Sequence, residues 1–477
     1  MKSISFWSVL VAGCVLGITP HLRADVKLPQ VLASHMVLQR QMPVPIWGTA
    51  DAGESVSVAL GANTATAVAG ADGKWSVKLK AMEAGGPHEL IIKGKNEIKL
   101  TDVLIGEVWV GSGQSNMEWS VAQSANAAAE IEAAKYPNIR LFHVRKTATV
   151  LPQDDVILDR EWSECSPATI PNFSAVSYFF GRKIQEELKV PVGLINTSWG
   201  GTMIEPWTPI VGFESVESLK PFAEGVKAQQ AKPEGVQPNA GSPTHLYNGM
   251  IHGIVPFAIR GALWYQGESN RGNGVDYEPR MRALINGWRT VWNEGDFPFL
   301  YVQIAPYKYV KPPETDPNFL LPQLWEAQTK TLAVKNTGMA VTTDITNLDD
   351  IHPNNKQDVG KRLALWALAK TYGQDGLVYS GPLYKSMKVE GNKIRIEFDH
   401  VGSGLKSRDD QPLSWFTIAG KDGDFVEAKA TIDGKSVVVS SDKITEPAAV
   451  RFGWNEIATP NLMNADGLPA GPFRTSR

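Results

Sequence analysis

Residues 104–117, with the sequence LIGEVWVGSGQSNM, decide the fold of this 477-residue chain. The apolar run Leu104–Val110 predicts a buried strand, which ends in the small-residue turn Gly111-Ser112-Gly113-Gln114-Ser115. In open α/β sheets, functional sites form beyond the carboxyl ends of the strands. We therefore expect Ser115 to lie at the edge of a parallel sheet, where its hydroxyl can meet residues from neighbouring strands.

Strands and helices alternate after this turn. The pattern predicts strands at residues 192–196, 258–265, 299–304 and 339–343, and helices at residues 122–135, 174–188, 277–292, 324–335 and 356–372. Such alternation is typical of a mostly parallel sheet with helices on both faces. We therefore predict an α/β domain over residues 104–375.

The two flanking regions are expected to be β-rich. Residues 25–103 contain short alternating segments, such as 75–79 (WSVKL), each bounded by turn residues such as 71–74 (ADGK). Residues 376–477 show the same pattern of short alternating segments, for example at 387–398. The sequence thus predicts an N-terminal β module at 25–103 and a C-terminal one at 376–477, both sandwich-like.

Residues 1–24 have the pattern of a secretory signal peptide. Lys2 precedes an apolar stretch at 4–18, and Leu22-Arg23-Ala24 offers a small-residue cleavage site. A stretch of ~15 apolar residues is short for a membrane span. We expect export to the periplasm or the extracellular space and no transmembrane span in the mature chain. Lipid anchoring at Cys14, within Val11-Ala12-Gly13-Cys14, is the less favoured alternative.

Composition excludes several classes of protein. Lys and Arg number 47 against 50 Asp and Glu, for a net charge of −3, and no run of like charge stands out. This argues against a nucleic-acid partner. A hydrophobic content of 43% argues against wholesale disorder. After removal of residues 1–24 only Cys165 remains, so an internal disulfide and a cysteine-based metal site are both ruled out.

Polar residues follow four of the expected strands. Ser115 can act as a nucleophile or cap the next helix. Gly200 and Gly201 allow close backbone approach, with N–H groups free to stabilise an oxyanion, or they form a tight turn. Gln266 can donate a hydrogen bond from a strand end. Glu268 can serve as a general acid or base, or orient its neighbours.

The fourth polar segment contains one of only eight histidines. His352 follows Asp349 and Asp350 just before an expected helix. A carboxylate beside the imidazole can hold the tautomer that accepts a serine proton, although such a loop can also simply cap the helix. The order Ser, Asp, His along the chain is compatible with a hydrolase triad.

Together, these segments resemble the sialate O-acetylesterase group of the SGNH hydrolases. The resemblance covers nearly the whole mature chain and rests on four motifs: Gly113-Gln114-Ser115-Asn116-Met117, Trp199-Gly200-Gly201-Thr202, Trp264-Tyr265-Gln266-Gly267-Glu268-Ser269-Asn270 and Asp350-Ile351-His352-Pro353. It implies a flavodoxin-like three-layer α/β sandwich. It also implies an enzyme that removes acetyl groups from sugar hydroxyls, with no metal and no organic cofactor.

The resemblance assigns a role to each motif. Ser115 would be the nucleophile, and His352 the general base and then the general acid. The oxyanion hole would consist of the Ser115 N–H, an N–H at Gly200 or Gly201, and the side chain of Gln266. Two further residues would support the site: Asn116 and Glu268.

The third member of the triad stays open. The superfamily pattern Asp-x-x-His selects Asp349, whereas the family resemblance also favours Asp350. Asp344, at the end of an expected strand, is a third candidate. A working Ser115–His352 dyad is a further alternative.

Three other functions compete with sialate deacetylation. The same chemistry would suit acetylated xylan or pectic glycans, since the motifs select acetyl-sugar esters better than they select the sugar. Glycoside hydrolysis through Glu268 and a second carboxylate would leave the Ser115–His352 combination unexplained. A non-catalytic carbohydrate-binding protein would fit the two β modules and the 15 tryptophans. For the favoured esterase interpretation, the expected partner is an acetylated sugar or glycan substrate.

Overall fold

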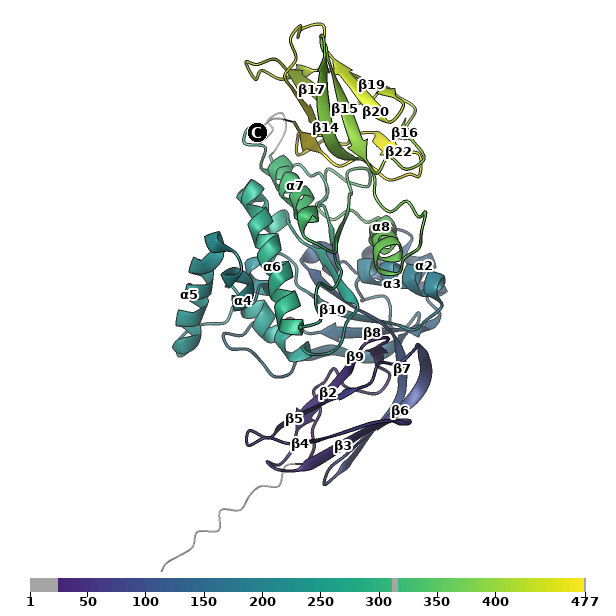
Figure 1. Cartoon of the computed structure of the whole chain (residues 1–477), viewed down its shortest axis with the longest axis vertical. Coiled ribbons are helices and arrows are strands. Elements are labelled where there is room, and N and C mark those ends of the chain that lie inside the picture. The colour runs from purple at the N-terminus through teal and green to yellow at the C-terminus, as the bar shows by residue number, and fades with distance from the viewer. Residues whose placement is uncertain (1–24, 311–315, 476–477) are drawn as a thin grey trace, which may run out of the picture.

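The computed structural model describes residues 25–310 and 316–475. Three parts follow one another along the long axis of the molecule: an N-terminal β region, a central α/β region and a C-terminal β region (Figure 1). The expected signal peptide at 1–24, including Cys14, lies outside the described residues. In the described part of the chain, no helix is long and apolar enough to cross a membrane.

A seven-stranded path forms the centre of the molecule. Its neighbours are parallel throughout, except for the antiparallel pair at one edge, β8 and β9. In spatial order the strands are β13 (Thr337–Ala340), β12 (Phe299–Val302), β11 (Gly261–Tyr265), β7 (Glu97–Gly113), β10 (Val192–Ser198), β8 (Tyr136–Val144) and β9 (Leu158–Cys165). The predicted mostly parallel sheet is confirmed.

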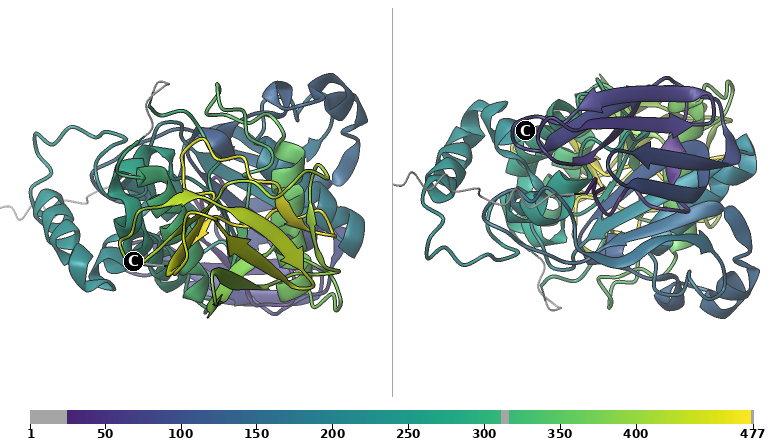
Figure 2. Two further views of the ribbon diagram at one scale, coloured as in Figure 1. Left: turned by 90° about the horizontal axis from the view of Figure 1, so that it is seen from above. Right: turned by 90° about the horizontal axis from the view of Figure 1, so that it is seen from below.

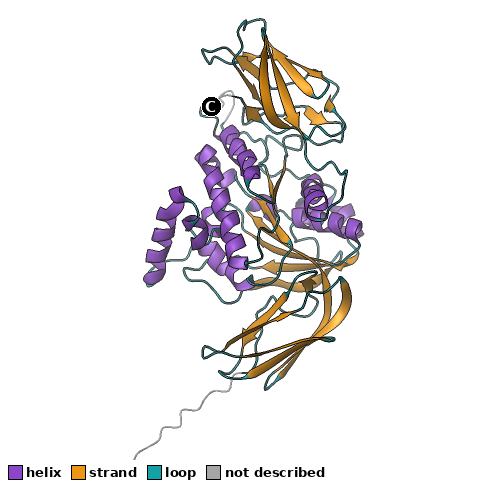
Figure 3. Ribbon diagram, in the orientation of Figure 1, coloured by secondary structure: helices purple, strands orange, loops and turns teal. Residues whose placement is uncertain are grey.

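Helices cover both faces of this sheet (Figure 3). On one face, α3 (Ala175–Leu188) packs against α8 (Lys356–Trp366), with the short α2 (Ala127–Ala133) nearby. On the other face lie α4 (Ile210–Glu214), α5 (Lys220–Ala231), α6 (Tyr277–Trp292) and α7 (Leu320–Lys330). The two groups stay on opposite sides when the molecule is seen from its ends (Figure 2).

Two expected helices are shorter than predicted. The segment at 122–135 divides into a 3₁₀ turn, Val121–Gln123, and α2, because Asn126 adopts a left-handed φ of 56° between them. The segment at 356–372 is α-helical only to Trp366 and continues as the π-helical turn Ala367–Thr371.

Strand β7 joins the N-terminal region to the central sheet. It runs without interruption across the expected domain boundary between residues 103 and 104. The first half of β7 pairs with β6 (Gly85–Lys93), and its middle pairs with β1 (Val37–Gln39). Its last residues lie between β10 and β11. From Val103 to Gly113 every residue is buried.

The N-terminal region shares its core with the central sheet. Its remaining strands are β2 (Val44–Thr49), β3 (Ser55–Leu60), β4 (Asn63–Val68) and β5 (Lys74–Leu79). Strand β5 alternates between exposed and buried residues, as its sequence predicts. Val56 and Leu79 belong to the same continuous core as Trp109 and Trp288 of the α/β region.

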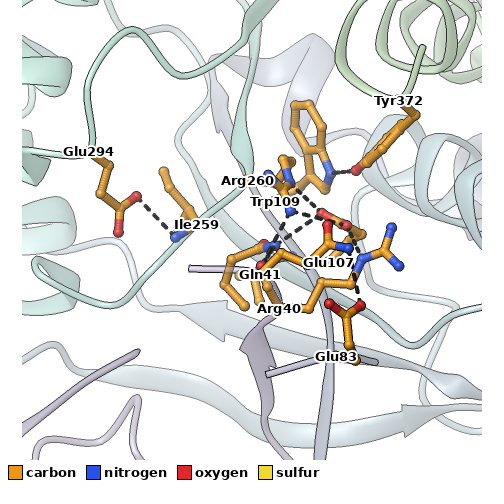
Figure 4. A network of polar contacts seen from close by, with 11 residues as sticks. Arg40, Gln41, Glu83, Glu107, Trp109, Ile259, Arg260, Glu294 and Tyr372 are labelled. Carbon is orange, nitrogen blue, oxygen red and sulfur yellow. Dashed lines mark hydrogen bonds and ion pairs between the residues drawn. The ribbon is translucent and has the colours of Figure 1, made fainter. Parts of the chain in front are cut away.

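A buried carboxylate links these two regions (Figure 4). Glu107, in β7, has no exposed surface, and its carboxylate accepts hydrogen bonds from Arg40 and from Arg260 Nε, the latter at 2.6 Å. Arg40 follows β1 of the N-terminal region and Arg260 precedes β11 of the central sheet. Gln39 Nε2 adds a third contact at 3.1 Å. The charge of Glu107 is thus compensated from both sides of the junction.

The C-terminal region has its own core. Ile394, Phe416, Val437 and Phe452 belong to a cluster separate from the main core. Its strands are β14 (Leu383–Glu390), β15 (Lys393–Asp399), β16 (Leu405–Ser407), β17 (Phe416–Ala419), β18 (Val426–Glu427), β19 (Lys429–Asp433), β20 (Ser436–Ser440), β21 (Ala449–Phe452), β22 (Leu462–Asn464) and β23 (Phe473–Arg474).

Candidate active site

The turn after β7 places Ser115 beside the end of β11. Gly113 has a φ of +139°, and a Cβ atom there would lie 2.2 Å from the carbonyl oxygen of Tyr265. Only glycine permits this approach. The Gln114 N–H donates to the same carbonyl at 3.0 Å, and the short helix α1 (Ser115–Glu118) begins at the next residue. The Ser115 side chain is therefore held at the sheet edge, where it is half-buried.

The loop between β13 and α8 brings His352 to this serine. His352 Nε2 lies 2.9 Å from Ser115 Oγ. The imidazole ring stacks on the indole of Trp119, with ring centroids 4.6 Å apart and planes inclined by 16°. This packing restricts the orientation of the ring, so that Nε2 faces the hydroxyl.

Asp350 lies on the other side of the imidazole. Its Oδ1 is 3.4 Å from His352 Nδ1 and accepts the His352 backbone N–H at 2.9 Å. Burial lowers the pKa of His352 below its ordinary value, and Lys356 contributes in the same direction, whereas Asp350 raises it. The neutral imidazole, with a lone pair free to take the Ser115 proton, is thus the form favoured near pH 7.

The other two candidate aspartates lie elsewhere. Asp349 points to solvent with 81% of its side chain exposed, and its Oδ1 is 2.7 Å from Lys308 Nζ. Asp344 is buried and accepts two hydrogen bonds from the Arg362 guanidinium, at 2.7 and 2.6 Å. Among the three carboxylates, only that of Asp350 contacts His352 in the described structure.

Of the two candidate glycines, Gly200 is the one beside the nucleophile. A Cβ atom on Gly200 would lie 3.2 Å from Ser115 Cβ, whereas one on exposed Gly201 would meet nothing within 4 Å. The Gly200 N–H donates to Glu118 Oε2 at 2.6 Å, and Glu118 Oε1 accepts from Lys146 Nζ at 2.6 Å. The Glu118 carboxylate thus accepts the Gly200 N–H, which the sequence analysis expected to be available for an oxyanion.

Gln266 does not present a free donor, contrary to the expectation from the sequence. Its side chain is wholly buried, and its Nε2 donates to Thr202 O at 3.1 Å and to Asn270 Oδ1 at 2.6 Å. Its Oε1 accepts from the Tyr277 hydroxyl at 2.6 Å. The amide therefore braces the loops after β10 and β11 and has no N–H left for a substrate.

Gln114 is a residue whose side chain the sequence analysis passed over. Its Oε1 accepts the backbone N–H groups of Gly267 and Ser269, at 3.4 and 3.2 Å. Its Nε2 donates to no other residue in the described part of the chain. An anchored amide with an unused nitrogen thus directly precedes Ser115, and its position inside the motif GQSNM was the available signal.

Asn116 and Glu268, the two expected supporting residues, contact each other. Asn116 Nδ2 donates to Glu268 Oε1 at 2.6 Å and to the carbonyl oxygen of Ile351 at 3.0 Å. The Asn116 Oδ1 accepts from the Lys356 ammonium. Burial raises the pKa of Glu268 and lowers that of Lys356 to about 7. The sequence analysis overlooked Lys356, which lies four residues after His352.

Cys165 takes no part in this arrangement. It is buried in β9, and burial raises the pKa of its thiol to about 12, so the nucleophilic thiolate is disfavoured. Within residues 25–310 and 316–475, no group of three His, Cys, Asp or Glu side chains is arranged to hold a metal ion.

Comparisons with known proteins identify a family for this chain. The family model for a carbohydrate esterase, sialic acid-specific acetylesterase, matches residues 105–369. The sialate O-acetylesterase of Homo sapiens is 34% identical over 483 residues, which cover 92% of this chain and 90% of the human protein. That of Rattus norvegicus is 34% identical over 412 residues, 75% of each chain.

A solved structure is also similar. A carbohydrate acetylesterase from Xanthomonas citri shares 39% sequence identity and a TM-score of 0.85, with 94% of this chain and 99% of that chain covered. The family resemblance read from the four sequence motifs is confirmed. The chain therefore belongs to the family of sialic acid-specific carbohydrate acetylesterases.

Proposed function

We propose that this protein hydrolyses O-acetyl esters of sugars, sialic acid foremost, by the serine chemistry of an SGNH hydrolase with a three-layer fold. The observation that carries the proposal is the 2.9 Å contact between Ser115 Oγ and His352 Nε2, with Asp350 on the far side of the imidazole. The curated relatives at 31–34% identity are sialate O-acetylesterases, which supports this choice of sugar.

In the proposed mechanism, Ser115 Oγ attacks the acetyl carbonyl carbon while His352 Nε2 takes the hydroxyl proton. The tetrahedral intermediate collapses, the sugar hydroxyl leaves with the proton from His352, and Ser115 carries the acetyl group. Water, deprotonated by His352, then attacks the acetyl-enzyme. Acetate leaves and Ser115 recovers its proton. Asp350 stabilises the imidazolium that forms in each step.

The negative oxygen of the intermediate needs preorganised donors. We assign the backbone N–H groups of Ser115 and Gly200 to this role, with the side-chain NH₂ group of Gln114 as the third donor. The Gly200 N–H is bound to Glu118 in this structure, so the Glu118 carboxylate must move aside as the oxyanion forms. The ion pair between Glu118 and the half-exposed Lys146 can hold the Glu118 carboxylate after it has left the Gly200 N–H.

A second candidate is the deacetylation of other glycans, such as acetylated xylan or pectic side chains. The Xanthomonas citri neighbour, at higher identity than the vertebrate relatives, is named only as a carbohydrate acetylesterase. Glycoside hydrolysis is less well supported, because Glu268 is buried and accepts a hydrogen bond from Asn116. A purely binding function leaves the Ser115–His352–Asp350 arrangement without a purpose.

Release of acetate tests the proposal. Purified protein lacking residues 1–24, which we propose to be removed on export, is offered O-acetylated sialic acid, acetylated xylan and an acetylated pectic fragment, beside a Ser115→Ala variant. We expect acetate from O-acetylated sialic acid with the parent protein and none with Ser115→Ala. Release from xylan alone would favour the second candidate. Equal release by both proteins would refute the assignment of Ser115.

A further inference from the structure

A buried lysine lies behind the catalytic pair. Lys356, the first residue of α8, has no exposed surface. Its Nζ lies 5.1 Å from the ring centroid of Tyr265 and 5.9 Å from that of Trp119, the residue on which His352 stacks. Burying an ammonium group costs free energy unless partners compensate it. The Oδ1 of Asn116 is the oxygen to which this ammonium donates.

Asn116 connects the two segments that carry the reacting side chains. It directly follows Ser115, and its Nδ2 donates to the carbonyl oxygen of Ile351, the residue directly before His352, at 3.0 Å. The same nitrogen donates to Glu268 Oε1 at 2.6 Å. One carboxamide thus ties the nucleophile turn after β7 to the loop between β13 and α8.

The orientation of this carboxamide depends on Lys356. Both partners of the Asn116 nitrogen are acceptors, and the partner of its oxygen is a cation. If the amide turned over, its NH₂ group would face the ammonium and its oxygen would face a carboxylate and a carbonyl. Each contact would then be repulsive. With Lys356 in place, only the observed orientation keeps the tie to Ile351.

We propose that Lys356 is a positioning residue for the deacetylation reaction, which holds Ser115 and His352 at reacting distance by orienting the Asn116 carboxamide. Glu268 completes this Lys356–Asn116–Glu268 unit from the opposite side. The inference rests on the proposed function, because it concerns the same serine and histidine. Lys356 acts through Asn116 and does not itself contact the ester.

The charge of Lys356 has a second, measurable consequence. Three charged groups act on the imidazole of His352: Asp350 from its own loop, Glu118 from α1 and Lys356 from α8. The two carboxylates raise the pKa of His352, and the ammonium lowers it. Glu268 and Asp350 favour the charged form of Lys356. Removal of the ammonium is therefore expected to raise the pKa of His352, together with the acid limb of the pH profile.

Kinetics of Lys356→Met, Asn116→Ala and the double variant test the proposal, with Lys361→Met, an exposed residue of the same helix, as the control. The substrates are 4-nitrophenyl acetate and the best acetylated sugar. We expect Lys356→Met to lower kcat by about 10²-fold, the size of effect that a small misplacement produces, with KM nearly unchanged. The acid limb of kcat/KM should move to higher pH. The double variant should lose no more than Asn116→Ala alone.

Folding is checked by thermal unfolding, and Lys356→Arg keeps the charge if Lys356→Met is unstable. An Arg variant that keeps the parent's acid limb would support the proposal. It would be overturned if folded Lys356→Met had the kcat and acid limb of the parent, or if the two losses simply multiplied in the double variant. The Ser115→Ala variant distinguishes failure of the Lys356 proposal from failure of the proposed function. If the parent protein were no more active than Ser115→Ala, the proposed function would be refuted.

Discussion

At the scale of single residues, the site depends on which partners each polar group already has. The sequence shows Ser115, Asp350 and His352 only as separate polar residues. In the structure, His352 contacts Ser115 through Nε2 and Asp350 through Nδ1. Gln266 and Gln114 carry the same amide, but the first has acceptors for both N–H groups, whereas the nitrogen of the second has no acceptor among residues 25–310 and 316–475. Chemical identity alone therefore does not define a catalytic role.

The pH dependence of the reaction belongs to this scale. The proposed mechanism needs neutral His352, whose pKa is lowered mainly by burial. We expect the acid limb of kcat/KM to lie below pH 6.5. In Asp350→Asn the pKa should fall further, because the carboxylate raises it, while kcat drops about 10–10²-fold. This loss is smaller than in buried triads, because Asp350 is half-exposed. Asp349→Asn is the matched control, and pH–rate profiles of all three proteins measure both effects.

These profiles can also contradict the assignment of the third carboxylate. If Asp349→Asn lost more activity than Asp350→Asn, the loop would have to rearrange when substrate binds. If neither substitution mattered, Ser115 and His352 would work as a dyad.

The two glutamines give a second prediction. We expect Gln114→Ala to lower kcat by about 10²–10³-fold, the cost of removing one oxyanion donor. It should also lose stability, because the N–H groups of Gly267 and Ser269 lose their acceptor. Gln266→Ala should lower the free energy of unfolding by about 1–3 kcal/mol, because Thr202 O, Asn270 and the Tyr277 hydroxyl lose their partner, but it should leave the kcat of the folded protein nearly unchanged. Steady-state kinetics and denaturant unfolding separate the two. If Gln266→Ala lowered kcat and Gln114→Ala did not, Gln266 would be the oxyanion donor.

At the scale of elements, the site forms because three parallel strands end side by side. Ser198 at the end of β10 and Tyr265 at the end of β11 are both in register with Gly113 of β7. The motifs that follow these strands therefore begin at the same level of the sheet. The loop before α8 then needs only to cross this edge to deliver His352.

Substitution of Gly113 tests how the end of β7 positions Ser115. In Gly113→Ala, a Cβ would collide with the Tyr265 carbonyl, and a φ of +139° is strained for any other residue. The end of β7 must then separate from β11 and displace Ser115. We expect loss of nearly all activity and a fall in stability of about 1–3 kcal/mol. Gly201→Ala, where the added methyl meets open space, shows how much of any loss comes from backbone strain alone.

At the scale of the whole molecule, the N-terminal region is a continuation of the catalytic sheet. One core and one long strand, β7, run through both regions, and the Glu107 carboxylate is shared between Arg40 and Arg260. The C-terminal region has a separate core, and Glu456 reaches from it to the Val310 N–H at 2.9 Å. The two β regions thus differ in how strongly they should couple to the site.

Replacement of Glu107 tests this coupling. Glu107→Ala leaves two guanidinium groups without their carboxylate, a kind of change that typically costs about 3–5 kcal/mol. We expect the thermal midpoint to fall for the whole N-terminal and central unit in one transition. Asp154→Asn, which removes an exposed ion pair with Lys74, should leave the midpoint unchanged. Separate melting of the N-terminal region in Glu107→Ala would show that the shared core does not bind the two together.

The sequence by itself determined the alternation of strands and helices, the parallel sheet and the motifs that carry Ser115 and His352. It could do so because periodicity, turn residues and short motifs are local properties of the chain. Only the tertiary structure decided that Asp350 rather than Asp349 faces the imidazole, that Gly200 rather than Gly201 lies beside Ser115, and that Gln266 is fully bonded. It also revealed Lys356 beside Asn116, 240 positions earlier in the chain. These outcomes depend on burial and on contacts between distant segments, which exist only once the sheet has brought its strand ends together.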